Sequence, residues 1–237
     1  KVPFYANGRP RHGALDSDAD AANLASFSEA VKRGLDQNSV AYDIVTDEQI
    51  VAGELAAYSL AIFPFALDTT PEHTQAILDY VAGGGNVMWF FSVPEGLQEM
   101  LGLQALTYRR NEYEGQLHTM QQVRQESKSA QVATELSDGA TAIADWLDSK
   151  GTSTGTPAVV MTDHSVWVAH VLWPKADTAA QHHLLLATIG HFVTGAWERM
   201  VGDALAGALA GTGYADFDEL LAATRGNQAA AASARQA

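Results

Sequence analysis

The sequence LAIFPFALDTTPEHTQAILDYVAGGGNVMWFF, residues 60–91, decides the fold class of this chain. Residues 60–65 are apolar without alternation, which predicts a strand buried on both faces. A helix is expected to follow, because Pro71 after two threonines is a helix start signal and Gly83-Gly84-Gly85 is a stop signal. Residues 86–91 form a second apolar run. The stretch therefore predicts a β-α-β unit of a parallel sheet.

The residues before this unit continue the same alternation. Short apolar runs at 2–5 and 42–46 predict two more strands. Between them Leu24, Phe27, Val31 and Leu35 recur at helical spacing. Right-handed crossovers would wind these elements into an open sheet. We expect an α/β fold of the flavodoxin-like type, with a mostly parallel sheet and helices on both faces.

The second half of the chain is less regular. Residues 104–156 predict an insertion or a subsidiary sheet, with antiparallel strands near 108–110 and 117–123 and a helical stretch around Ile143, Trp146 and Leu147. Residues 157–161 and 166–173 predict a hairpin that turns at 163–165. We expect one α/β domain over 1–197 and a helical extension or linker over 198–237.

Composition excludes several classes of function. The formal charge of −14 disfavours nucleic acid as a partner, because affinity for phosphates depends on Lys and Arg. No apolar run is long enough to cross a bilayer, so no membrane partner is expected. The chain has no cysteine, which excludes disulfides and thiolate chemistry but leaves the compartment open. It begins with Lys1 rather than Met, so we expect a processed protein or a piece of a longer one.

Candidate catalytic residues are few. Ligands bind open parallel sheets beyond the carboxyl ends of the strands, where Ser92 is the one candidate nucleophile, with His164 or His170 as its base. The strained turn of a nucleophile elbow needs small residues on either side of the serine. The residues around Ser92 are bulky: Phe90, Phe91, Val93 and Pro94. No catalytic residue is therefore expected. Candidates for ligand binding at these loops are Asp68, Glu95 and Trp173.

No metal or cofactor is expected. Asp16, Asp18 and Asp20 alternate as in a calcium loop, but the glycine and the distal glutamate of that loop are missing. The histidine pair at 182–183 lacks the spacing of a zinc motif. The triple glycine follows a helix and precedes a strand, the reverse of a phosphate-binding loop.

Several blocks of the sequence carry a family resemblance. Residues 42–45, 60–65, 77–87 and 101–103 resemble the class I glutamine amidotransferase-like domains of glycoside hydrolases, such as the trimerisation domain of β-galactosidases. Residues 166–172 and 184–191 are similar to the domain that precedes the barrel in family-10-like glycoside hydrolases. Together the two resemblances cover most of 1–197. Both imply a fold rather than an activity.

The resemblance implies a role without catalysis. True amidotransferases use a cysteine nucleophile with His and Glu partners, whereas here Ser92 falls near that position. We expect a non-catalytic accessory domain associated with a glycoside hydrolase, with a structural or oligomerisation role. Its partner would be a catalytic barrel, another protein domain or a second copy.

Two alternatives stay open. One is a carbohydrate-binding module that uses strand-end aromatic residues, although Trp89, Trp167 and Trp173 fall in predicted strands where core packing is the default. The other is a small serine hydrolase that uses Ser92.

Overall fold

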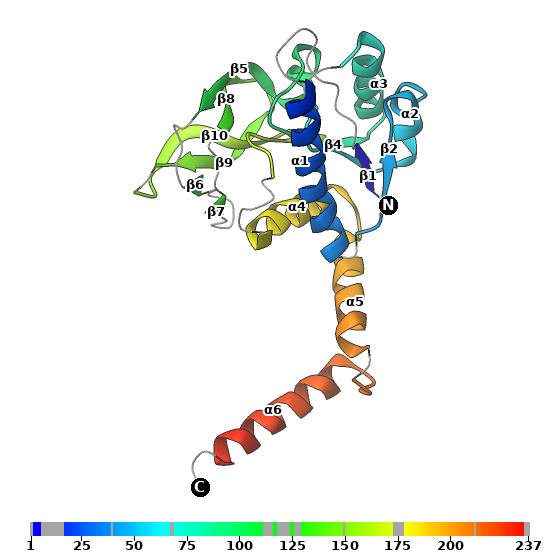
Figure 1. Ribbon diagram of the computed structural model, residues 1–237, viewed down its shortest axis with the longest axis vertical. Coiled ribbons are helices and arrows are strands. Elements are labelled where there is room, and N and C mark those ends of the chain that lie inside the picture. The colour runs from blue at the N-terminus through cyan, green and yellow to red at the C-terminus, as the bar shows by residue number, and fades with distance from the viewer. Residues whose placement is uncertain are drawn as a thin grey trace. The chain divides into compact units, whose positions relative to one another are not determined.

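The computed structural model describes residues 2–5, 17–38, 40–66, 69–110, 116–117, 124–125, 129–148, 150–172, 178–210 and 212–234. The chain divides into two compact units, Lys1–Thr194 and Gly195–Ala237. The first unit holds a sheet with helices against it (Figure 1). The second unit consists of helices α5 (Ala196–Leu209) and α6 (Phe217–Ala234).

The first unit is built around a sheet of seven strands in the order β2-β1-β3-β4-β11-β10-β9. Two further sheets, β5-β8 and β6-β7, have two strands each. In chain order the elements are β1 (Val2–Tyr5), α1 (Ser17–Gln37), β2 (Tyr42–Val45), α2 (Asp47–Val51), η1 (Glu54–Ala57), β3 (Leu60–Phe63), α3 (Pro71–Ala82), β4 (Asn86–Phe90), η2 (Glu95–Leu97), η3 (Glu99–Leu101), β5 (Leu103–Arg110), β6 (Gln116–Leu117), β7 (Arg124–Gln125), β8 (Ser129–Leu136), β9 (Thr141–Leu147), β10 (Ser153–Met161), β11 (Ser165–Val168) and α4 (Thr178–Phe192).

The parallel part of the sheet confirms the predicted flavodoxin-like fold. Strands β2, β1, β3, β4 and β11 are all parallel, and their order is the flavodoxin order 2-1-3-4-5. The crossover from β1 to β2 runs in the opposite direction to those from β2 to β3 and from β3 to β4. Right-handed crossovers therefore place α1 on one face and α2 and α3 on the other. Helix α4 packs against α1 and shares its face.

The β-α-β unit of residues 60–91 forms as its sequence predicts. All of β3 is buried, as expected for an apolar run without alternation. Thr70 caps α3 by accepting a hydrogen bond from the His73 amide, and Pro71 takes the first helical position. Gly84 has a φ of 91° and ends the helix, with the Gly85 amide bonded to the Tyr80 carbonyl 3.0 Å away. This 6→1 bond is that of a Schellman motif.

The antiparallel part corrects one prediction. The stretch around Ile143, Trp146 and Leu147, expected to be helical, is strand β9, which pairs with β10 in the main sheet. Pairing with β10 and burial of Trp146 override the weak local helical spacing. The predicted hairpin is present as β10 and β11. Residues 104–156 thus contain the β5-β8 sheet and also strands of the main sheet, while most of the predicted strand at 117–123 lies outside the described residues.

The core lies between the central strands and the helices that cover them. Trp89, Trp146 and Trp167 are its largest fully buried side chains. The ring of Trp89 stacks on Phe63 of the adjacent strand, with centroids 4.5 Å apart. Trp89 and Trp167 are therefore core residues rather than a surface platform.

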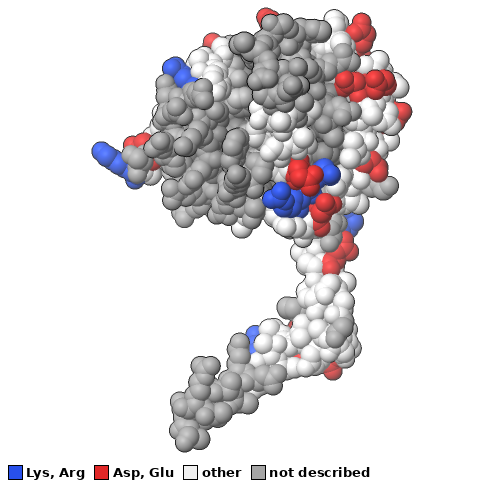
Figure 2. Space-filling model, in the orientation of Figure 1, with Lys and Arg blue, Asp and Glu red and all other residues white. Residues whose placement is uncertain are grey.

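Acidic side chains lie at several places on the surface. Figure 2 shows Asp and Glu side chains spread around α2 and α3, with a mixed group of charges near the end of α1. Among the described helices, none combines the length and the apolar character needed to span a bilayer.

A buried serine in α1 provides a first prediction. Ser28 is 5% exposed, and its Oγ is enclosed without a hydrogen-bond partner among the described residues. Ser28→Ala removes the desolvated hydroxyl and adds helix propensity, so it should raise the free energy of unfolding by about 1 kcal/mol. Urea denaturation measures this. Ser26→Ala, at a half-buried position of the same helix, is the control, with an expected gain from propensity alone of about 0.5 kcal/mol. A net loss in Ser28→Ala would show that the hydroxyl has a stabilising partner.

Candidate functional site

The place where this fold binds ligands is the carboxyl edge of the parallel strands, next to the point where the strand order reverses. That point lies between β1 and β3, which pair through Phe4 and Ile62. Phe65, two residues beyond β3, packs edge-on against Phe27 of α1 with ring centroids 5.1 Å apart. Both side chains are buried, together with Val171 beyond β11. In the part of this edge that the structure describes, aromatic packing therefore lies beside the expected ligand position.

The turn after β4 is strained and firmly held. Phe91 has a φ of 67° and is the one non-glycine with positive φ among the described residues. The Trp167 indole donates a hydrogen bond to the Phe91 carbonyl at 2.8 Å, and the Trp89 indole donates one to the Ser92 carbonyl at 2.7 Å. A left-handed residue with a Cβ costs about 1–2 kcal/mol, so the surrounding contacts must maintain this backbone. Two buried tryptophans do so.

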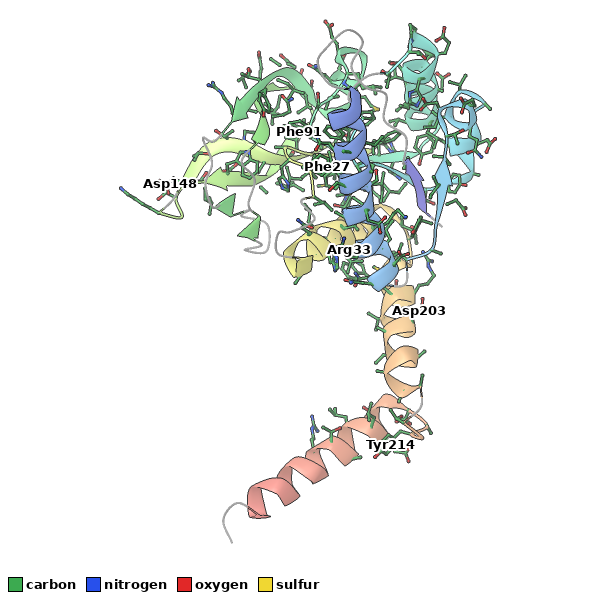
Figure 3. All side chains as sticks on the ribbon, viewed as in Figure 1. Phe27, Arg33, Phe91, Asp148, Asp203 and Tyr214 are labelled. Carbon is green, nitrogen blue, oxygen red and sulfur yellow. The ribbon has the colours of Figure 1, made fainter. Side chains whose placement is uncertain are left out.

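Four rings form what we call the aromatic row: Phe27, Phe65, Phe91 and Tyr108. Phe65 and Phe91 stack with centroids 6.1 Å apart, and Tyr108 of β5 meets Phe91 edge-on at 6.0 Å. Figure 3 marks Phe27 on α1 and Phe91 beside the sheet. The row runs from the buried Phe27 to Tyr108, which is 50% exposed. Its exposed end therefore lies on the β5-β8 sheet.

The strain at Phe91 predicts that a glycine variant is more stable there than an alanine variant, the reverse of the usual order of stability. Both Phe91→Ala and Phe91→Gly lose the ring, but only glycine adopts a φ of 67° without penalty. We expect Phe91→Gly to be more stable than Phe91→Ala by about 1 kcal/mol in chemical denaturation. At Phe65, which has no positive φ, alanine should be the more stable of the same two replacements. An alanine variant that is the more stable at both positions would contradict a strained turn at Phe91.

Ser92 and His170 both lie at the carboxyl edge. Ser92 follows Phe91 directly and is buried. His170, two residues beyond β11, is also buried, and its Nδ1 donates to the Val171 carbonyl at 2.8 Å. Burial lowers the pKa of His170 to about 4, while the hydrogen bond to Val171 opposes part of that shift. His170 is therefore a neutral core imidazole at pH 7, tilted against the Trp146 ring.

His164 lies at the opposite edge of the sheet. Its Nδ1 is 3.1 Å from the Asn86 Oδ1, at the start of β4. Ser92 lies beyond the other end of β4, six residues along the chain. At about 3.3 Å per residue the strand separates the two residues by roughly 20 Å. The topology therefore keeps His164 away from Ser92.

Of the three candidate ligand residues, the structure describes Glu95. Glu95 opens η2 and is exposed. Asp68 and Trp173 lie outside the described residues, as do Asp16 of the calcium-like pattern and the loop 6–16 that follows β1. In the part of the chain that the structure describes, no three His, Asp or Glu side chains gather as a metal would require.

Sequence reasoning missed the residues that characterise this edge. Phe65, Phe91 and Tyr108 belong to no recognisable motif. The clustering of phenylalanines at the ends of residues 60–65 and 86–91 was the one available signal. The left-handed backbone had no signal, because a φ above zero is normally marked by glycine or asparagine.

Comparison with known proteins shows the fold. No family model matches the chain, and no curated protein matches its sequence. Among solved structures, Gan42B, a GH42 β-galactosidase, superposes with a TM-score of 0.54 at 13% identity over 79% of this chain and 29% of that one. A ThuA-like protein from Bacteroides uniformis gives 0.52 at 12% identity, over 78% and 86% of the two chains. A GMP synthase component from Thermoplasma acidophilum gives 0.46 at 9% identity, over 77% and 90%.

The first two of these neighbours share the α/β fold of this chain. Identities of this size establish fold and not activity. The chain spans less than a third of the β-galactosidase it matches. In that enzyme the matching region is therefore one part of a larger protein.

Proposed function

We propose that this chain is a non-catalytic accessory domain associated with a glycoside hydrolase, and that it acts through contacts with other protein domains. The observation that carries the proposal is the aromatic row, because it occupies the edge where a sheet of this type normally places its reactive groups. The strained position after β4 holds Phe91, which has no nucleophilic atom. Ser92 is one residue further on, in a buried setting.

The electrostatics support the same proposal. A serine nucleophile needs a base within hydrogen-bond reach. His164 lies at the other edge of the sheet, and burial holds His170 neutral with its Nδ1 committed to the Val171 carbonyl. A base with a pKa of about 4 is a poor acceptor for a serine proton. Hydrolysis at Ser92 is the less favoured function for this reason.

The association with a glycoside hydrolase draws on the structural neighbours. The fold of this chain recurs in a β-galactosidase, where it makes up 29% of the chain. Among the described residues no base lies within reach of Ser92, which favours a role through contact with other protein domains. The partner we propose is a catalytic barrel or a second copy of this domain.

Activity assays test the non-catalytic part. The protein and its Ser92→Ala variant are compared with chromogenic esters and chromogenic glycosides as substrates. We expect the two proteins to give the same turnover, because Ser92 takes no part in any reaction. Glu95→Gln, an exposed position on the same edge, is the matched control for a change near the loop. A turnover that Ser92→Ala abolishes and Glu95→Gln retains would overturn the proposal in favour of a serine hydrolase.

Cross-linking tests the contact part. The protein is purified from its native source, and a carboxyl-directed reagent is used because the chain has 28 acidic residues against 14 basic ones. We expect cross-links from this domain to residues of another domain or of a second copy. If all cross-links at native concentration joined residues within one copy of this domain, the proposal that it acts through contacts with other domains would be contradicted.

A further inference from the structure

Helices α5 and α6 make up the second unit of the chain and expose much of their apolar surface. Among the described side chains of that unit, Ala196 is the one that is buried. Trp197 is 45% exposed and Val201, one turn further along α5, is 53% exposed. In proteins most of the stability of a helix comes from packing of its apolar face rather than from helix propensity. Within this unit, that packing is missing from α5.

The exposed apolar side chains of α5 lie in one line along the helix. They recur at spacings of four, three and four residues, and we call them the α5 stripe: Trp197, Val201, Ala204 and Ala208. This is the spacing of the a and d positions of a helix bundle, where side chains pack against a neighbouring helix. Asp203, which Figure 3 marks on α5, falls on the other side of the helix.

Helix α6 carries the same spacing with charges beside it. Leu221 and Thr224 take a and d positions, and the Thr224 hydroxyl donates to the Leu220 carbonyl 2.9 Å away, so its methyl group can be covered without an unpaired hydroxyl. Asp218 and Arg225 are exposed and lie about two turns apart on the side next to Leu221. Ion pairs within a helix join positions three or four residues apart, so these two charges do not suit each other.

The order of the two charges fits a second copy of the same helix. In an antiparallel pair of α6 helices with a two-fold axis near Leu221, Arg225 of each copy lies beside Asp218 of the other. The pair thus contains two equivalent contacts between opposite charges. In a parallel pair the two positions fall on opposite sides of the contact, and neither charge meets the other. Charge complementarity therefore selects a second copy in the antiparallel orientation.

We propose that α5 and α6 form a self-association surface, through which two copies of this chain pair with their α6 helices antiparallel and with the α5 stripe covered in the same contact. Two copies contribute four helices, the number that commonly closes a bundle around an apolar core. This inference rests on the proposed role in contact and names a second copy as the partner.

Sedimentation velocity of the full chain, from low to high micromolar concentration, tests the pairing. We expect a concentration-dependent dimer. Asp218→Arg and Arg225→Asp should each raise the dimer dissociation constant about tenfold, because each substitution turns two attractive contacts into two repulsive ones. When the two variants are mixed in equal amounts, both contacts are attractive again. The mixture should therefore associate about tenfold more tightly than either variant alone.

Two substitutions in α5 separate the stripe from the opposite side of the helix. Val201→Glu would place a charge in the covered contact and should weaken the dimer by about a hundredfold or more. Asp203→Arg is the matched control, because it changes the charge of the same helix outside the stripe and should alter the dissociation constant by no more than about twofold. Circular dichroism checks that both variants keep their helices.

Two results would overturn this inference. One is a chain that stays monomeric at the highest concentration. The other is a dimer whose dissociation constant is the same in the parent protein, in Asp218→Arg and in Arg225→Asp, because its contact would then lie elsewhere. Both results leave the proposed role in contact standing if cross-linking joins this chain to a different protein domain, so the two proposals fail separately.

Discussion

Gly85→Ala is expected to destabilise the protein by about 3 kcal/mol, more than any other substitution within the triple glycine. Gly85 is buried, and a Cβ on it would overlap three ring carbons of Tyr80, Cδ2, Cε2 and Cζ. Tyr80 cannot move away freely, because its hydroxyl lies 3.2 Å from the carbonyls of both Tyr58 and Asn86. Burial also raises the pKa of this hydroxyl to about 12, so it stays a donor at neutral pH.

The neighbouring glycines are matched controls for this prediction. Gly83 has a φ of −78°, and a methyl group added to it would meet only ordinary contacts, so Gly83→Ala should change the free energy of unfolding by no more than about 0.5 kcal/mol. Gly84 has open space but a φ of 91°, and Gly84→Ala should lose about 1 kcal/mol through strain. Chemical denaturation of the three variants measures the order. Equal losses at 83 and 85 would contradict a packing role for Gly85.

Lowering the pH from 6.5 to 4 is expected to destabilise the protein by about 3 kcal/mol through His170 alone. Burial lowers the pKa of this imidazole from 6.5 to about 4 in the folded state. Between these values the unfolded chain binds a proton at His170 and the folded chain does not, so stability falls as pH falls. Above pH 6.5 both states are neutral and the contribution of His170 is fully present.

The measurement is the difference in pH dependence between the protein and its variants. His170→Gln keeps a donor for the Val171 carbonyl but cannot titrate, so its stability should vary less with pH across this window. His182→Gln is the control, because the pKa of His182 is also lowered, by burial and by Arg33, but its ring is only half-buried. That variant should retain most of the pH dependence. A His170→Gln profile parallel to that of the parent protein would show that His170 titrates normally when folded.

The fold was largely predictable because its signals are local. Apolar runs without alternation marked β3 and β4, and a capping threonine with Pro71 marked the start of α3. The helix predicted around Trp146 was wrong, because pairing between β9 and β10 decided that segment. Strand pairing joins residues through their backbones, and no single stretch of sequence encodes it.

The candidate site was predictable only as a location. Sequence order placed the loops after β3 and β4 at one edge, and it named Ser92 and two histidines there. It could not show that β11 runs parallel to β4 and so carries His164 to the opposite edge. The sequence also did not predict the left-handed turn at Phe91. The indoles that hold this turn come from Trp89 and from Trp167, which lies on another strand.

By itself the sequence determined the class of this protein: a parallel α/β sheet, acidic and without cysteine chemistry, whose glycines at 83–85 end a helix. Those properties follow from composition and from short-range periodicity. Only the tertiary structure decided which side chains meet at the carboxyl edge. The aromatic row joins α1, the ends of β3 and β4, and β5. These residues converge because the crossovers and the strand order bring distant segments together, an arrangement that depends on the whole sheet.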